Sequence, residues 1–210
     1  KLATEELFPT DGHTLVQCVT YSGHSPFIIP EESKRISFSD KLPERLRNYM
    51  IVANYTDYAI GQFITFLRSQ KKFENTMIVI TGDHEGFGLT RKPLYEHALG
   101  KDIISPERFT PLIVLNSPVH LRYEKVMGQV DLYPTLLDLL GADDYPWRGL
   151  GESILSSGKK AFAISPQMEI IGDTVGVSTA EIQHAKDAWR VSDLIISCDY
   201  FAHGRTGDKK

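Results

Sequence analysis

Asp83 and His84 stand side by side directly after a run of apolar residues that favours β-structure, in the sequence TMIVITGDHEG (76–86). In α/β sheets, ligands collect beyond the carboxyl ends of the strands. A carboxylate oxygen and an imidazole nitrogen at such a place can hold one divalent ion, and this pair suits zinc or manganese better than calcium. The alternative is structural: Asp83 caps a turn and His84 is a surface residue. Two residues do not complete a metal site, so further ligands must come from elsewhere.

His24 is a second candidate, in the loop SGHSPF (22–27) after an apolar segment. An imidazole there can donate to a substrate oxyanion or protonate a leaving oxygen, and a loop histidine bonded to the backbone is the alternative. Arg91 and Lys92 follow the Asp-His pair and can bind an anionic group, unless they are only a solvated cationic pair. The other histidines have no partners at ligand spacing and are expected to be solvated or structural; they are His13, His97, His120, His184 and His203. No GxSxG, Walker A, GxGxxG or HExxH pattern occurs, so no nucleophile is apparent.

The composition is that of an ordinary globular protein: 210 residues, 41% hydrophobic and 24% charged, with a net charge of −4. The absence of a basic stripe argues against nucleic acid as a partner. No apolar stretch is long enough to predict a membrane span, and no signal peptide is visible; because the sequence starts at Lys1, we expect a processed or excised piece. Cys18 and Cys198 lie in largely apolar stretches without a CxxC pattern, which predicts buried free thiols, with a disulfide between them as the alternative.

The elements expected to position these residues alternate between strands and helices. Strands are predicted over 13–20, 75–83 and 110–116, the last two buried on both faces. A long helix is predicted over 40–71 with Asp40 as N-cap, and another over 128–142 that ends at Gly141. Residues 85–109 look irregular. The residues recurring at helical spacing are, in the first helix, Leu42, Leu46, Tyr49, Met50, Ala53, Ile60, Phe63, Ile64 and Leu67, and in the second, Val130, Leu132, Tyr133, Leu136, Leu137 and Leu140.

The last part of the chain contains two short β-like segments, 159–165 and 169–178, which form a hairpin or two separate strands. Ser178 and Glu181 fit a capping box that opens a final helix. Residues 193–201 continue that helix or form an edge strand, because periodicity alone does not decide. The whole pattern predicts an α/β fold in a single domain, 1–210.

Five separated segments, in this order, resemble the C-terminal half of the catalytic domain of the lipoteichoic-acid-synthase-like sulfatases. They are VTYSGHSPFIIP, YTDYAIGQFITFLRSQKKFENTMIVITGDHEG, TPLIVLNSP, GQVDLYPTLLDLLG and WRGLGESIL, within about residues 14–155. The closing AWRVSDLIISCDYF is similar to the tail of such proteins. This group belongs to the alkaline phosphatase superfamily and includes phosphoglycerol transferases. The resemblance implies a layered α/β fold with a mixed, mostly parallel sheet, helices on both faces, and its N-terminal part missing.

The resemblance also implies a division of roles. These enzymes use a threonine, or in true sulfatases a modified cysteine or serine, on a divalent metal: manganese or zinc, or calcium or magnesium. Asp83 and His84 correspond to metal ligands and His24 to a contact with the substrate's phosphate or leaving group, while Arg91 or Lys92 offers a basic substrate contact. The nucleophile and first acidic ligand are expected upstream, since no threonine before Ser22 has the required context. The chain alone is therefore expected to be inactive and to bind metal weakly or not at all.

For the full-length parent, the resemblance implies a hydrolase or phosphoglycerol transferase acting on phosphate or sulfate esters of the cell envelope, such as phosphatidylglycerol or an envelope glycan. N-terminal membrane helices would anchor it, with this domain on the outer face of the cytoplasmic membrane or in the periplasm. The alternative is a non-catalytic binding or regulatory module for anionic envelope polymers. The sequence does not decide between sulfate and phosphate esters, between a hydrolase and a transferase, or which metal and oligomeric state the protein has. The fragment is expected to self-associate through exposed sheet edges.

Overall fold

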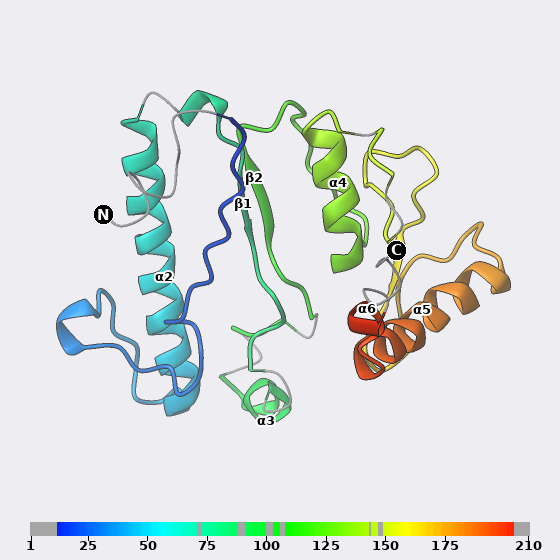
Figure 1. Cartoon of the computed structure of the whole chain (residues 1–210). Helices are drawn as coiled ribbons and strands as arrows, with labels where there is room; N and C mark the ends of the chain where they lie inside the picture. Colours follow the sequence, from blue (N-terminus) through cyan, green and yellow to red (C-terminus); the bar gives the residue numbers. More distant parts are fainter. Residues whose placement is uncertain are drawn as a thin grey trace. The chain divides into compact units, whose positions relative to one another are not determined.

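The structure, a computed structural model, describes residues 12–70, 73–87, 91–99, 103–105, 108–142, 144–146 and 149–203 (Figure 1). The chain divides into two units, Lys1–Asn116 and Ser117–Lys210, which are treated separately below. The long cyan helix α2 and the green strands β1 and β2 of Figure 1 belong to unit 1, and the segments from α4 to α6 belong to unit 2.

Helix α2 (Glu44–Arg68) is the longest element of unit 1 and confirms the predicted helix. It begins after Pro43, which is the N-cap; Asp40, the predicted N-cap, instead accepts a hydrogen bond from Arg47 Nη1 at 2.8 Å. The buried residues of the helix are Leu46, Ile51, Val52 and Leu67. Ile51 and Val52 lie outside the predicted face because they pack against Phe27 and Ile29 of the preceding segment, a partner that helical periodicity cannot show.

Strands β1 (Ile78–Thr81) and β2 (Leu112–Leu115) form an antiparallel ribbon, with Ile78 opposite Leu115 and Thr81 opposite Leu112. The two predicted strands are confirmed, but no residue of either is fully buried, so their expected burial on both faces is wrong. A two-stranded ribbon leaves much of its surface uncovered. The short 3-10 turns η1 (Glu31–Ser33) and η2 (Phe73–Asn75) complete unit 1 together with α3 (Arg91–Glu96), which forms inside the region predicted to be irregular.

The predicted strand 13–20 is absent: these residues are unpaired, with Leu15 94% and Val19 80% exposed. An apolar extended segment becomes a strand only when a neighbouring strand receives its hydrogen bonds. Cys18 and Cys198 are free, but both are exposed, which corrects their predicted burial.

Unit 2 contains η4 (Gln129–Asp131), α4 (Leu132–Leu139), β3 (Phe162–Ile164), β4 (Ile170–Gly172), α5 (Thr179–Ser197) and α6 (Tyr200–His203). Helix α4 ends in a Schellman motif, in which Gly141 has φ +68° and Ala142 N–H donates to the Leu137 carbonyl at 2.9 Å. The predicted core face of α4 is wrong for Val130, Tyr133 and Leu140, which are exposed, whereas its other members Leu132, Leu136 and Leu137 are half-buried. The fully buried residues are Asp131, Pro134 and Thr135. The side of α4 that carries Asp131 and Thr135 is buried because these two residues belong to a cluster of hydrogen-bonded polar groups.

Strands β3 and β4 form the antiparallel hairpin that the sequence offered as one of two possibilities. The capping box before α5 is confirmed: Ser178 Oγ accepts from Glu181 N–H, and Glu181 Oε2 accepts from Ser178 N–H at 2.7 Å. Helix α5 continues to Ser197, so the alternative prediction of an edge strand over residues 193–201 is wrong. Trp189 of α5 donates its indole N–H to the Ile164 carbonyl of β3 at 3.2 Å. Across the described ranges both sheets are antiparallel and two-stranded, so the parallel sheet implied by the resemblance does not appear in them.

Candidate metal and substrate site

The loop that carries His24 is a chain of tight turns. His24 N–H donates to the Tyr21 carbonyl at 3.0 Å, and Phe27 N–H donates to the His24 carbonyl at 3.1 Å, across a cis Ser25–Pro26 peptide. The His24 ring stacks on Tyr21 with centroids 5.9 Å apart, and its Nδ1 lies 2.8 Å from the Ser25 carbonyl oxygen. Since a carbonyl only accepts, this hydrogen bond requires a proton on Nδ1, and in the neutral ring Nε2 then keeps its lone pair.

Asp83 and His84 occupy the turn that follows β1. His84 N–H donates to Asp83 Oδ1 at 3.0 Å, so Asp83 does cap this turn. The His84 ring lies with Nδ1 2.9 Å from the Glu85 carbonyl and Nε2 3.8 Å from Asp83 Oδ2. The hydrogen bond to the Glu85 carbonyl, and after it the negative charge of Asp83, raise the pKa of His84 above its ordinary value. The two side chains therefore face each other at the exposed end of the strand.

Three aromatic rings join the two loops. Phe27, at the end of the His24 loop, makes edge contacts with Phe87, which follows the Asp-His turn, and with Tyr49 of α2; the centroid distances are 5.7 and 5.3 Å. Tyr49 and Phe87 are themselves 4.4 Å apart. A Cβ on Gly86 would lie 2.6 Å from the Tyr49 hydroxyl, so any other residue there would require the Tyr49 ring to shift. The structure thus brings together the two motifs that carry the predicted site residues, through rings that sequence analysis did not single out.

Both loops reach this arrangement with unusual backbone conformations. Phe27 has φ +62° and Phe87 has φ +65°, in the left-handed region that non-glycine residues seldom occupy. Phe27 is only 6% exposed, so burial of its ring offsets the backbone cost. The sequence signal available for these residues was the position of a phenylalanine three residues after each candidate histidine, in HSPF and HEGF.

The donor atoms of Asp83 and His84 fit a shared divalent ion. Metal–oxygen and metal–nitrogen bonds of about 2.1 Å each allow donors up to about 4.2 Å apart to bind one ion, and the two atoms here are 3.8 Å apart. The Nδ1 contact with a backbone carbonyl is the orientation typical of metal-binding histidines. Both side chains are accessible, at 68% for His84 and 87% for Asp83. Within the described ranges no group of three or more His, Cys, Asp or Glu residues converges on such a position, so this pair offers two ligands.

The predicted cationic residues open helix α3. Lys92 Nζ lies 3.8 Å from Glu96 Oε1 on the same helix. Buried Leu94 anchors the helix. Sequence analysis missed Arg108, whose Nη1 lies 3.9 Å from Glu85 Oε1 and so places a guanidinium beside the residue that follows His84. Its isolated position in the sequence gave no signal for this contact.

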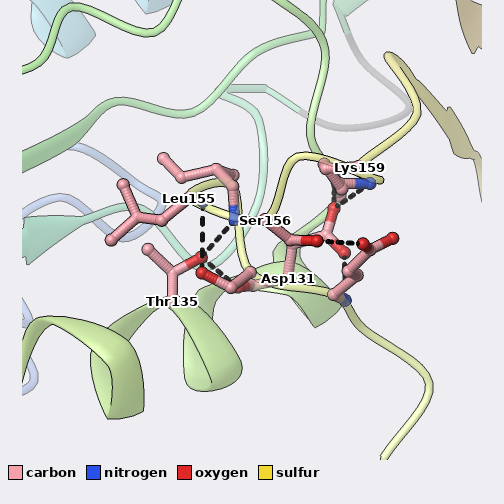
Figure 2. Close-up of polar contacts among 9 residues, drawn as sticks. Asp131, Thr135, Leu155, Ser156 and Lys159 are labelled. Atoms are coloured by element: carbon pink, nitrogen blue, oxygen red, sulfur yellow. Dashed lines mark hydrogen bonds and ion pairs between the residues drawn. The ribbon is translucent and has the colours of Figure 1, made fainter. Parts of the chain in front are cut away.

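Unit 2 contains a separate buried polar cluster around Asp131, shown in Figure 2. Asp131 is 3% exposed, and its carboxylate accepts hydrogen bonds from Gly128 N–H at 2.8 Å, Glu152 N–H at 2.9 Å and Lys159 Nζ at 2.9 Å. The hydroxyl of Thr135 donates to the Asp131 carbonyl at 2.7 Å. With these partners the carboxylate ties three segments of unit 2 together, which is a structural role.

Comparison of the sequence with known proteins identifies the family of the chain. The Sulfatase family model matches residues 3–142, two thirds of the sequence, and the chain belongs to this family. It is 32% identical over 155 residues to the lipoteichoic acid synthase-like protein YvgJ of Bacillus subtilis (strain 168), covering 70% of this chain and 25% of that protein. It is 30% identical over 146 residues to the lipoteichoic acid synthases of Staphylococcus aureus strains USA300 and NCTC 8325 / PS 47, covering 67% of this chain and 22% of each. The chain thus spans about a quarter of the length of these curated relatives.

Proposed function

We propose that this chain is the C-terminal portion of the catalytic domain of a metal-dependent sulfatase-like enzyme, either an ester hydrolase or a phosphoglycerol transferase. Membership of the Sulfatase family and the likeness to lipoteichoic acid synthases support this class. In this proposal the two units, residues 1–210, belong to one layered α/β domain whose mostly parallel sheet includes further strands of the parent. The substrates are phosphate or sulfate esters of the cell envelope, such as phosphatidylglycerol or an envelope glycan.

In the proposed site, Asp83 and His84 hold the divalent ion, manganese or zinc, or calcium or magnesium. The bound ion supplies electrostatic stabilisation of negative charge on the phosphoryl or sulfuryl group. The Glu85 carbonyl orients the His84 ring so that Nε2 faces the carboxylate. His24 binds the substrate's oxyanion or leaving oxygen, and its Nδ1 contact with the Ser25 carbonyl restricts the ring orientation.

The observation that carries this proposal is the packing of Phe27 on Phe87, with centroids 5.7 Å apart, supported by Tyr49. Through it the His24 loop and the Asp83–His84 turn share one buried aromatic cluster, although they are far apart in sequence. Catalysis requires its groups to be held in a fixed geometry, and packing on a long helix provides that rigidity. Arg91 or Lys92 of α3, which follows the turn in the sequence, supplies the proposed cationic contact to the substrate.

We also propose that the parent protein acts on the outer face of the cytoplasmic membrane or in the periplasm, as expected for an enzyme that uses envelope lipids. Among the helices of the described residues, none is long and apolar enough to cross a membrane. In this proposal, N-terminal membrane helices anchor the parent protein.

The test is turnover of an aryl phosphate, an aryl sulfate and a phosphatidylglycerol analogue by the full-length parent, with and without manganese. His84→Ala and Asp83→Asn should reduce turnover of the accepted substrate by at least a hundredfold, while His120→Ala, at an exposed histidine of unit 2, should leave it unchanged. If no substrate reacts, or if His84→Ala has no effect, the catalytic proposal is wrong and a binding module for anionic envelope polymers replaces it.

A second measurement addresses the chain alone. Two protein ligands are fewer than the three or four that metal sites usually provide. We therefore expect isothermal titration of the 210-residue chain with manganese or zinc to show no sub-micromolar binding, and no turnover of the substrates above. Sub-micromolar binding that Asp83→Ala abolishes would contradict this expectation and show that the pair suffices.

A further inference from the structure

Unit 2 contains a cleft bounded by three segments of the chain: residues 124–126, residues 159–161 at the entrance to β3, and residues 172–175 at the end of β4. Its volume is about 590 Å³, within the range of about 300–1,000 Å³ typical of small-molecule sites. The lining is unusually rich in charged side chains, with Lys125, Lys159 and Lys160 against Glu124 and Asp173.

The acidic groups of the cleft are already hydrogen-bonded within the chain. Glu124 Oε1 lies 3.2 Å from Arg122 Nε, and Asp173 Oδ1 accepts from Val175 N–H at 2.8 Å. The lysines differ from one another. Lys159 is paired with buried Asp131 at 2.9 Å. Lys125 and Lys160 make no direct hydrogen bond or ion pair with any described residue, although Lys160 is near enough to Glu181 of α5 for its charge to act on that carboxylate. Two ammonium groups of the lining are thus available, while its two carboxylates are partly satisfied.

The walls of the cleft are held together by a close backbone approach. Gly172 has φ +98°, and a Cβ there would lie 2.2 Å from the Ala161 carbonyl oxygen and 2.8 Å from Val126 Cβ. Asp173 N–H donates to that same Ala161 carbonyl at 2.8 Å. All three segments therefore meet at one glycine, so the cleft is a built feature of unit 2 and not an opening between loose loops.

We propose that this cleft binds a phosphate group, through the ammonium groups of Lys125 and Lys160. Lysine binds phosphate as a compact point charge with several donors, so two lysines that line one cleft can contact different oxygens of one phosphate. The bound group belongs either to a soluble phosphate ester or to a phospholipid headgroup, since the chemistry is shared. The proposal uses only residues of unit 2 and is independent of the catalytic proposal for Asp83 and His84.

The test is titration of the 210-residue chain, followed by NMR of its backbone amides, with three probes: inorganic phosphate, glucose 1-phosphate, and vesicles containing an anionic phospholipid. Amides of Lys160, Gly172 and Val175 should shift on binding. The Lys125→Gln/Lys160→Gln variant should bind at least about fivefold more weakly, as expected for the loss of two partly screened charges. Binding by the ester but not by vesicles identifies a soluble ligand, and binding by vesicles alone identifies a headgroup.

The controls separate a site from general charge attraction. Lys41→Gln removes the same charge from an exposed position of unit 1 and should leave binding unchanged, and Lys125→Arg/Lys160→Arg should retain it. If the double glutamine variant does not fold, Lys125→Gln alone, at an exposed position, should still weaken binding about twofold. The proposal is overturned if none of the probes shifts the cleft amides, or if Lys41→Gln weakens binding as much as the cleft variants do.

Discussion

Replacement of Asp131 by alanine should destabilise unit 2 strongly. The carboxylate accepts three hydrogen bonds, from Gly128, Glu152 and Lys159, all between 2.8 and 2.9 Å. The Asp131 and Lys159 side chains are 5% and 10% exposed. Removing one partner of a buried ion pair costs about 3–5 kcal/mol, because the other charge is left without compensation. We expect about 3 kcal/mol here, since Lys159 also lines a cleft through which water can reach its ammonium group.

The assay is urea unfolding followed by tryptophan fluorescence, because Trp189 of α5 packs on β3 within unit 2. With a denaturant slope of about 1–3 kcal/mol per molar, the midpoint should fall by about 1–3 M. Asp131→Ala combined with Lys159→Met should be at least about 1 kcal/mol more stable than Asp131→Ala alone, since no unpaired charge remains. As a control, Asp187→Ala at an exposed position of α5 should change stability by less than about 0.5 kcal/mol. A loss below about 1 kcal/mol for Asp131→Ala would refute the assignment of Asp131 as the centre of this cluster.

Three further predictions concern the remaining features. Gly86→Ala should destabilise unit 1 by about 1–3 kcal/mol in thermal unfolding, because the added Cβ would press on the Tyr49 hydroxyl; an unchanged midpoint would contradict the close approach. An NMR titration of His84 should give a midpoint above that of a histidine in an unfolded peptide, because the adjacent backbone carbonyl raises its pKa; its contribution to stability is then complete below the unfolded pKa and is lost as pH rises through the folded pKa. The backbone N–H of Ser178, and after it the Ser178 hydroxyl, lower the pKa of Glu181, whose contribution to stability is present above its unfolded pKa and lost as pH falls through the folded one. Ser178→Ala removes only the hydroxyl's hydrogen bonds, so the stability difference between wild type and variant, measured by circular dichroism, should shrink on acidification, and a constant difference would rule out this linkage.

Features set by near neighbours in the sequence could be predicted. Ser178 and Glu181 are three residues apart, so their capping box is visible in the sequence and is present in the structure. Gly141 marks the end of α4 for the same reason, because only the last turn of the helix decides its backbone conformation. The strand positions in 78–81 and 112–115 follow from short apolar runs of β-branched and aliphatic residues.

Features set by distant partners could not be predicted. Residues 13–20 have the composition of a strand, but a strand exists only where another chain segment pairs with it. The buried side of α4 is chosen by Asp131, whose partners at Glu152 and Lys159 lie in later loops. The helical periodicity predicted that the apolar side of α4 is buried, because it counts every carboxylate as a surface group and contains no information on distant hydrogen-bond partners.

The candidate site contains features set by near neighbours in the sequence and features set by distant partners. The adjacency of Asp83 and His84 after a strand was predictable, and the structure turns the two side chains toward each other. The contact of Phe27 with Phe87 joins segments far apart in the chain, so neither ring could be assigned a role from its own surroundings. The roles of Asp83, His84, His24, Arg91 and Lys92 in metal or substrate binding stay predictions, for which the experiments above are designed.

The contacts at the end of strand β2 bear on the order in which the two units fold during synthesis. Asn116, the last residue of unit 1, donates from its amide nitrogen to the carbonyls of Phe73 and Thr76 at 2.7 and 2.9 Å, and so fastens the end of the ribbon to η2. All three residues have left the ribosome before Ser117 and the following residues emerge. Because domains generally fold as units in the order of synthesis, these hydrogen bonds can form before the residues of the polar cluster of unit 2 have left the ribosome.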